Sequence, residues 1–182
     1  RHQYYYAREL YYHAFYNEAI TQFETFMDTK DGWSENKIEA CALAAYCFYQ
    51  LGKEEEALQM FFRSFEYDSP RAEICCDIGK HFLDRSKYQQ AIFWYKLAFN
   101  TKENKKSGFT LPECYGYIPC LQLCVCYDKL GDLSMAEHYN NIAGELKPSS
   151  KQYLYNKNYF DQKKNIILAS ILTKEKEHDK LK

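Results

Sequence analysis

The chain has 182 residues, a length that suits one compact domain or one short array of repeats. Its 24 lysines and arginines and 25 aspartates and glutamates give a formal net charge of −1, without the excess of positive charge expected of a nucleic-acid-binding domain. Seven glycines, four prolines and 18% aromatic residues argue against collagen, flexible linkers, a turn-dense β-sandwich and disorder.

Neither a membrane span nor a signal peptide is predicted. The longest apolar run near the C-terminus, residues 166–169 followed by Ile171 and Leu172, is far shorter than the roughly 20 residues that cross a bilayer. Residues 1–15 lack the apolar region of a signal peptide. We therefore expect no membrane contact and a cytoplasmic location. Because the chain begins with Arg1 rather than methionine, we also expect it to be part of a longer protein.

The eight cysteines are interpreted as small buried apolar side chains. They are Cys41, Cys47, Cys75, Cys76, Cys114, Cys120, Cys124 and Cys126. The sequence has no Cys-x-x-Cys pair, and no pair of histidines lies at ligand spacing beside them. Reduced thiols are therefore expected, and a zinc site is the alternative. The prediction includes neither a metal nor a cofactor.

Alanines recur along the chain and indicate an internal repeat. They are Ala19, Ala57, Ala91 and Ala136, separated by 38, 34 and 45 residues. A small residue lies twelve positions before each of them, at Ala7, Ala45, Gly79 and Cys124. The middle spacing is the 34-residue period of the tetratricopeptide repeat (TPR), a unit of two helices. The small side chains would let the two helices of a unit approach closely.

Tight turns between the paired helices support this interpretation. Gly52 and Gly131 are expected to adopt the left-handed conformation that ends a first helix. Ala14 and Ser86 take the same place in the first and third units, which is a weaker match. We therefore predict an all-α fold, a right-handed TPR superhelix (α-solenoid) of antiparallel helix pairs with C-terminal capping helices. An ordinary antiparallel helical bundle is the alternative.

The spacing also predicts how the chain is organised. The predicted parts are TPR units at 1–30, 34–68, 69–100 and 117–148, an inserted loop at 101–116, capping helices at 149–172 and a polar tail at 173–182. Ser69 and Pro70 are typical of an N-cap and the first residue of a helix. The cap is expected to consist of two short helices, 153–160 and 161–172, and the tail is expected to fray.

The inserted loop has lost the helical periodicity and is interpreted as a surface loop. We interpret it as a tolerated insertion. A place on the functional face is the alternative, because insertions in repeat arrays lie in loops and often on that face.

Motifs for catalysis are missing from the sequence. It has no glycine-rich phosphate loop, no Gly-x-Ser-x-Gly and no His-Glu-x-x-His. The five histidines are scattered, and the acidic run at 54–56 is typical of the start of a helix rather than of a ligand site. We therefore predict no catalytic residues in this chain, with an enzyme or metal protein as a weaker alternative.

A protein or peptide is the predicted partner, because the first helices of successive repeats line the concave face of such an array. The predicted contact residues on this face and at the N-terminal end are Tyr4, Arg8, Tyr11, Tyr12, Tyr46, Tyr49, Lys80, Asp84 and Asp128, beside Leu121 and Val125. Tyrosine suits such a surface because it buries much area with few rotatable bonds. About half of these tyrosines are expected to pack between units instead. The lysine and asparagine set of a chaperone-tail carboxylate clamp is missing, which disfavours a co-chaperone.

Several blocks go beyond the generic repeat pattern. They are YYYAREL at 4–10, PRAEICC at 70–76, AIFWY at 91–95, LQLCVCYDKLGD at 121–132 and NKNYF at 156–160. With these blocks, the chain up to about residue 160 resembles the TPR region that follows the catalytic domain in bacterial family 2 glycosyltransferases. The sublancin-type S-glycosyltransferases are similar in having helical repeats after their catalytic domain.

The resemblance implies an interaction module rather than a catalytic one. In such enzymes the sugar-nucleotide and metal residues lie in a domain that would precede Arg1, so none of them falls in this sequence. The repeats are thought to support dimerisation or to present the protein acceptor, which implies an upstream catalytic domain or a second copy as partner. The sequence departs from the family mainly at Asn100–Leu111. A standalone TPR scaffold that binds peptides is the alternative.

Overall fold

The computed structural model describes residues 2–103, 108 and 110–179, and the regular structure within them is entirely helical. Its α-helices are α1 (His2–Tyr12), α2 (Tyr16–Met27), α3 (Ser34–Gln50), α4 (Glu54–Arg63), α5 (Ala72–Asp84), α6 (Tyr88–Asn100), α7 (Tyr117–Lys129), α8 (Leu133–Leu146) and α9 (Lys151–Asp179). Two short 3₁₀ helices are η1 (Ser64–Glu66) and η2 (Pro112–Tyr115). The predicted all-α fold is confirmed.

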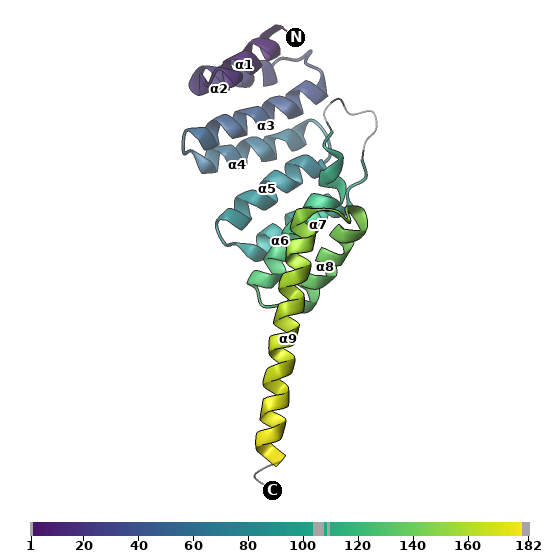
Figure 1. The fold of residues 1–182 in the computed structure, drawn as a ribbon. Coiled ribbons are helices and arrows are strands. Elements are labelled where there is room, and N and C mark those ends of the chain that lie inside the picture. The colour runs from purple at the N-terminus through teal and green to yellow at the C-terminus, as the bar shows by residue number, and fades with distance from the viewer. Residues whose placement is uncertain (1, 104–107, 109, 180–182) are drawn as a thin grey trace. The chain divides into compact units, whose positions relative to one another are not determined.

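The helices pack in two compact units, Arg1–Tyr115 and Gly116–Lys182. The first unit holds the pairs α1–α2, α3–α4 and α5–α6, which Figure 1 shows as successive layers. The second unit holds the pair α7–α8, with α9 packed on α8. In the first unit α2 also contacts α3, and α4 contacts α5, so that its pairs share one buried core.

Small side chains lie where the helices of a pair meet. The four repeated alanines and the four small residues twelve positions before them are all buried. In the third pair, a Cβ atom on Gly79 would lie 2.9 Å from the ring of Tyr95, which is itself buried. A larger side chain would therefore force that ring to move. This confirms the close approach that the spacing predicts.

The turns within the pairs have the predicted backbone conformation. Gly52 and Gly131 have φ angles of 71° and 82°, and Ala14 and Ser86 occupy the equivalent turns with φ angles of 60° and 56°. Glycine adopts this left-handed region without steric cost, whereas a residue with a Cβ atom is strained there. The α1–α2 and α5–α6 turns therefore carry strain that the other two turns avoid.

The eight cysteines are free and buried, as predicted. Burial raises the pKa of the Cys41, Cys124 and Cys126 thiols to about 12. These thiols therefore stay protonated and pack as small apolar side chains.

Two helices differ from the sequence-based expectation. Helix α5 begins at Ala72 with Arg71 as its N-cap residue, not at the Ser-Pro pair before it. Helix α9 is one continuous helix where two short helices and a frayed tail are predicted, and its C-terminal half extends beyond α8 (Figure 1). The reason is that no glycine or proline follows Pro148 to end the helix. Of the predicted tail, residues 180–182 lie outside the described residues.

Candidate protein-binding site

A pocket of about 540 Å³ lies between α3 and α5 in the first unit. Its lining comprises Glu35, Ile38, Glu39, Ala42 and Tyr46 of α3, Arg71, Glu73, Ile74 and Asp77 at the start of α5, and Gly108, Thr110 and Leu111 of the inserted loop. Side chains three, four and seven residues apart share one face of a helix, which explains how α3 and α5 each present several groups to it. The volume falls within the range of ligand sites in proteins.

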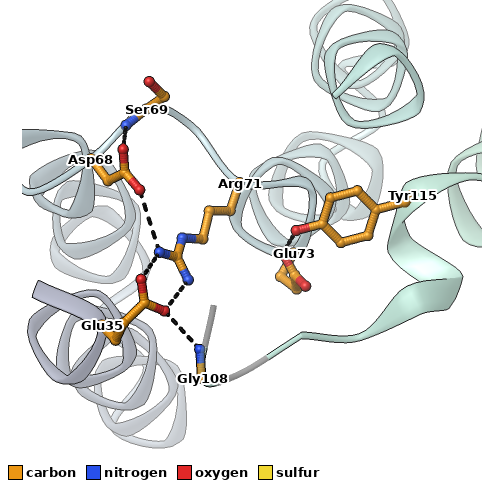
Figure 2. Close-up of polar contacts among 7 residues, drawn as sticks. All are labelled: Glu35, Asp68, Ser69, Arg71, Glu73, Gly108 and Tyr115. Carbon is orange, nitrogen blue, oxygen red and sulfur yellow. Dashed lines mark hydrogen bonds and ion pairs between the residues drawn. The ribbon is translucent and has the colours of Figure 1, made fainter. Parts of the chain in front are cut away.

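A buried ion pair joins the N-terminal ends of α3 and α5. The Arg71 guanidinium donates two hydrogen bonds to the Glu35 carboxylate, one of them 2.6 Å long (Figure 2). Arg71 also reaches Asp68 Oδ2 at 3.4 Å. Arg71 and Glu35 are only 8% and 7% exposed, so that water hardly competes for the pair. A bidentate pair of this kind fixes the distance and orientation of the two helix ends.

The inserted loop is anchored to the same helix ends. The Gly108 N–H donates to Glu35 Oε2 at 3.0 Å, and the Leu111 N–H donates to Glu73 Oε1 at 2.8 Å. The Tyr115 hydroxyl donates to the other oxygen of Glu73 at 2.9 Å, as Figure 2 shows. The described part of the loop therefore forms one border of the pocket, in addition to connecting two helices.

Asp77 faces the pocket next to a phenol. The Tyr46 hydroxyl donates to Asp77 Oδ2 at 2.6 Å. Burial raises the pKa of Asp77 to about 6, and the charges of Glu39 and Glu73 act in the same direction. The Tyr46 hydrogen bond and the Lys80 charge oppose this rise in pKa without cancelling it. Asp77 therefore changes its charge close to neutral pH.

Glu39 is half-buried on the α3 wall of the pocket. Burial raises its pKa, the Glu73 charge raises it further, and the charges of Arg8 and Arg71 lower it. The Arg8 guanidinium also stacks over the Tyr5 ring, 5.0 Å from its centroid. The neighbouring cations therefore offset only part of the cost of holding a charge on Glu39.

A second polar contact links α3 to α5 one turn further along. The Tyr49 hydroxyl lies 2.7 Å from His81 Nδ1, and burial lowers the pKa of this histidine. On the exposed side of α5, Lys80 Nζ pairs with Asp84 Oδ2 at 2.8 Å. Tyr46 and Tyr49 thus face α5, whereas Lys80 and Asp84 lie on the surface, and all four stay predicted contact residues.

The tyrosines of α1 divide between core and surface. Tyr4 is fully buried against Phe23 and Phe26 of α2, so its prediction as a contact residue is wrong. The reason is that Tyr4 shares the core-facing side of α1 with Ala7, one turn later. Tyr11 packs partly against the core, whereas Tyr12 is 63% exposed.

Asp128 lies in the second unit, where α9 covers it. The Tyr159 hydroxyl donates to Asp128 Oδ1 at 3.0 Å, and Lys163 Nζ lies 3.1 Å from the same oxygen. The prediction of Asp128 as a partner contact is therefore corrected, because a helix of the same chain already satisfies this carboxylate. On the same helix Leu121 is half-buried and Val125 is exposed.

The acidic lining of the pocket is not among the residues predicted from the sequence. Glu39 precedes Tyr46 by seven residues, and Asp77 precedes Asp84 by seven, so both lie on the helix faces that the prediction used. The helical spacing therefore gives a signal for Glu39 and Asp77, which lie nearer the N-terminal ends of the same helix faces. The place of Arg71 at the start of α5 is harder to predict, because the Ser-Pro pair before it favours an earlier start of the helix.

Within the described ranges, no group of three or more His, Cys, Asp or Glu side chains is placed to hold a metal ion. No helix in that part of the chain is both long and apolar enough to cross a bilayer.

Comparisons with known proteins identify the fold. Neither a protein-family model nor a curated protein matches the sequence. A solved structure of PilF from Pseudomonas aeruginosa is similar, with 16% identity and a TM-score of 0.59 over 86% of this chain and 65% of PilF. MamA of AMB-1 is similar at 17% identity and a TM-score of 0.59, over 84% of this chain and 76% of MamA. Both are TPR proteins, and this chain has the TPR fold.

Proposed function

We propose that this chain is a non-catalytic protein-interaction module that binds an extended peptide segment of a partner between α3 and α5. The observation that carries the proposal is the pocket of about 540 Å³, which combines apolar, phenolic and carboxylate groups on the face of the first helices. The TPR fold supports it, because stacked helix pairs present extended binding surfaces.

The test is a peptide-display selection on the folded chain, followed by binding measurements on two pocket variants. Ala42→Phe fills the pocket from α3, and Thr110→Trp fills it from the loop. Phe93→Ala is the matched control, because Phe93 is 61% exposed on α6 and does not line the pocket. We expect the selected peptides to lose binding to both pocket variants and to keep it with the control. Equal binding to all folded variants, with helicity checked by circular dichroism, would refute the proposal.

We further propose that the chain is the C-terminal part of a bacterial family 2 glycosyltransferase. The support is the sequence resemblance alone, and a standalone TPR scaffold is an equally supported second candidate. The residues that precede Arg1 in the gene discriminate between them. An α/β pattern with an Asp-x-Asp motif favours the glycosyltransferase, and a start codon directly upstream favours the scaffold. In either case we expect no sugar transfer or hydrolysis by residues 1–182 alone.

The partner proposed at the N-terminal end is the upstream catalytic domain or a second copy of the chain. An exposed aromatic cluster on α1 supports this, in which the Arg8 guanidinium lies over the rings of Tyr5 and Tyr12. Aromatic residues and arginine are enriched at protein interfaces. Substituting Tyr5 and Tyr12 together by serine is expected to weaken self-association or domain docking about tenfold, measured by analytical ultracentrifugation. An unchanged association constant would place the interface elsewhere.

We also propose that the chain works in a reducing compartment such as the cytoplasm. Eight buried, free thiols support this, because disulfides form and persist in oxidising compartments. The test is fractionation of cells that express the complete protein.

A further inference from the structure

The described residues that line the α3–α5 pocket carry more negative than positive groups. Among them, the four carboxylates of Glu35, Glu39, Glu73 and Asp77 lie beside one guanidinium, that of Arg71. This guanidinium forms its bidentate contact with Glu35. Within the described part of the lining, no cation forms an ion pair with any of the other three carboxylates.

The hydrogen bonds to two of these carboxylates come from neutral groups. Glu73 accepts from the Leu111 amide and the Tyr115 hydroxyl, and Asp77 accepts from the Tyr46 hydroxyl. Such donors hold a carboxylate in a fixed orientation but add no positive charge. The structure thus fixes the direction of both groups without neutralising them.

The charged forms of Glu39 and Asp77 are costly in the pocket. Burial is the main cause of the raised pKa of both groups, and each is also raised by neighbouring carboxylates. A positive charge that entered the pocket would favour the ionised forms and lower both pKa values. An anionic or apolar side chain would leave the cost in place.

Apolar side chains complete the pocket and restrict the kind of cation. Ile38 and Ala42 of α3 and Ile74 of α5 line it beside the carboxylates, together with Leu111 of the loop. Lysine and arginine bury an alkyl stem along apolar surface while the charged head meets polar groups. A small hydrated ion would gain nothing from these apolar contacts.

In the second unit, a lysine of the same chain pairs with an aspartate that also accepts a hydrogen bond from a tyrosine. Asp128 accepts a hydrogen bond from the Tyr159 phenol and pairs with the Lys163 ammonium at 3.1 Å. The Tyr46–Asp77 contact of the first unit has the same phenol and carboxylate, and a lysine would complete the set.

We infer that the pocket accepts the side chain of a lysine or arginine from the partner peptide, with its charged head between Glu39 and Asp77 and its stem along Ile38 and Ile74. The inference rests on the proposed function and specifies the chemistry of that site.

The test compares short blocked peptides that are identical except at one central position, which is lysine, arginine, norleucine or glutamate. Norleucine keeps the alkyl stem of lysine and removes the charge. Binding is followed by NMR through the backbone amide signals of Gly108 and Leu111, which border the pocket. We expect the lysine and arginine peptides to bind at least about tenfold more tightly than the norleucine peptide, with a smaller difference at high salt.

Two variants localise the effect. Glu39→Gln removes one pocket charge with little change in shape, and we expect it to reduce the preference for lysine over norleucine about fivefold or more. Glu55→Gln is the matched control, because Glu55 is exposed on α4 outside the pocket, and its preference should stay within about twofold of the parent.

Several other results of these binding measurements would overturn the inference. Equal binding of the lysine and norleucine peptides, or tighter binding of the glutamate peptide, would overturn the inference and leave a peptide-binding module in place. An equal loss in Glu39→Gln and Glu55→Gln would overturn it as well, because the attraction would then be non-specific. If no peptide shifts the two amide signals, the inference fails, and the display selection described above decides separately whether the chain binds peptides at all.

Discussion

Two contacts between helices contain the same pair of groups, a tyrosine hydroxyl and an aspartate. One contact joins α3 to α5 in the first unit, and the other joins α7 to α9 in the second unit. In each, a tyrosine hydroxyl donates to an aspartate 31 residues away, at 2.6 Å from Tyr46 to Asp77 and at 3.0 Å from Tyr159 to Asp128. In the second unit Lys163 adds a cation to the pair. In the first unit the neighbours of Asp77 include two further carboxylates, which raise its pKa.

We propose that this difference separates a structural contact from a binding site. The α7–α9 contact combines phenol, carboxylate and ammonium, and it fastens the last helix to its unit. The side chains of the α3–α5 contact line a pocket, and the carboxylates among its described residues outnumber the cations. On this proposal, the same residue types join two helices in the second unit and form a ligand site in the first.

The largest expected effect comes from removing the guanidinium of the first unit. Arg71→Ala leaves the Glu35 carboxylate buried without its ion pair, and we expect the free energy of unfolding to fall by about 3–5 kcal/mol. The control is Arg63→Ala, because the Arg63–Asp28 pair has an aspartate side chain that is 71% exposed. That variant should lose about 0–1 kcal/mol. Similar losses for the two variants in urea denaturation would show that the Glu35–Arg71 pair is not buried as described.

The two phenols provide a direct comparison of the units. Tyr46→Phe removes the hydroxyl that donates to Asp77, and we expect a loss of about 1.5–3 kcal/mol near pH 7 because a charged group loses its donor. Tyr159→Phe leaves Asp128 paired with Lys163, and the expected loss is about 0.5–1.5 kcal/mol. Thermal and urea denaturation measure both values. A larger loss for Tyr159→Phe would contradict the expectation that Asp77 depends more on its phenol than Asp128 does.

Stability should depend on pH through Asp77. Its pKa is raised from 3.8 to about 6 by burial and by Glu39 and Glu73, while Tyr46 and Lys80 oppose the rise. Between these values the folded chain holds the proton more tightly than the unfolded chain. The stability present at low pH is therefore lost as the pH rises through about 6, by about 1–3 kcal/mol. Asp77→Asn should flatten this part of the pH profile, and an identical profile in the variant would refute the assignment.

The smallest expected effect concerns the turns. Ala14→Gly and Ser86→Gly should each raise the free energy of unfolding by about 0.5–1 kcal/mol, because both residues have positive φ angles that only glycine adopts without strain. Gly52→Ala should lower it by about 1–2 kcal/mol, and the cost is one of backbone conformation because nothing lies within 4 Å of the added methyl group. Destabilisation by Ala14→Gly would show that the gain in unfolded-state entropy outweighs the relief of strain.

Features set by short-range geometry could be predicted from the sequence. The four turns depend on one backbone angle each, and the close approach of the paired helices depends on small residues at a fixed spacing. The turn residues and the spaced small residues can each be recognised in the sequence of a single repeat. The helix pairs and the left-handed turns at Gly52 and Gly131 are therefore predictable from the sequence alone.

Features that depend on contacts between distant residues could not be predicted in this way. The Glu35–Arg71 pair joins residues 36 positions apart, and its arginine lies just before a helix whose start the local signals misplace. Tyr4 and Tyr12 are both tyrosines of α1, and only the packing of that helix on α2 decides which is buried. The pocket itself forms where two helices and a loop meet, so it has no local signature.

In the described part of the first unit, neighbouring cations offset only part of the cost of holding charge in the α3–α5 pocket, and titration of the Asp77 side chain measures this cost. Carboxyl ¹³C chemical shifts, followed by NMR over a pH series and assigned with Asp77→Asn, report this titration. We predict a midpoint near 6, well above the usual value of 3.8. A midpoint at or below the usual value would show that neighbouring groups already compensate for the burial of Asp77, so that the pocket gains nothing from a partner's cation.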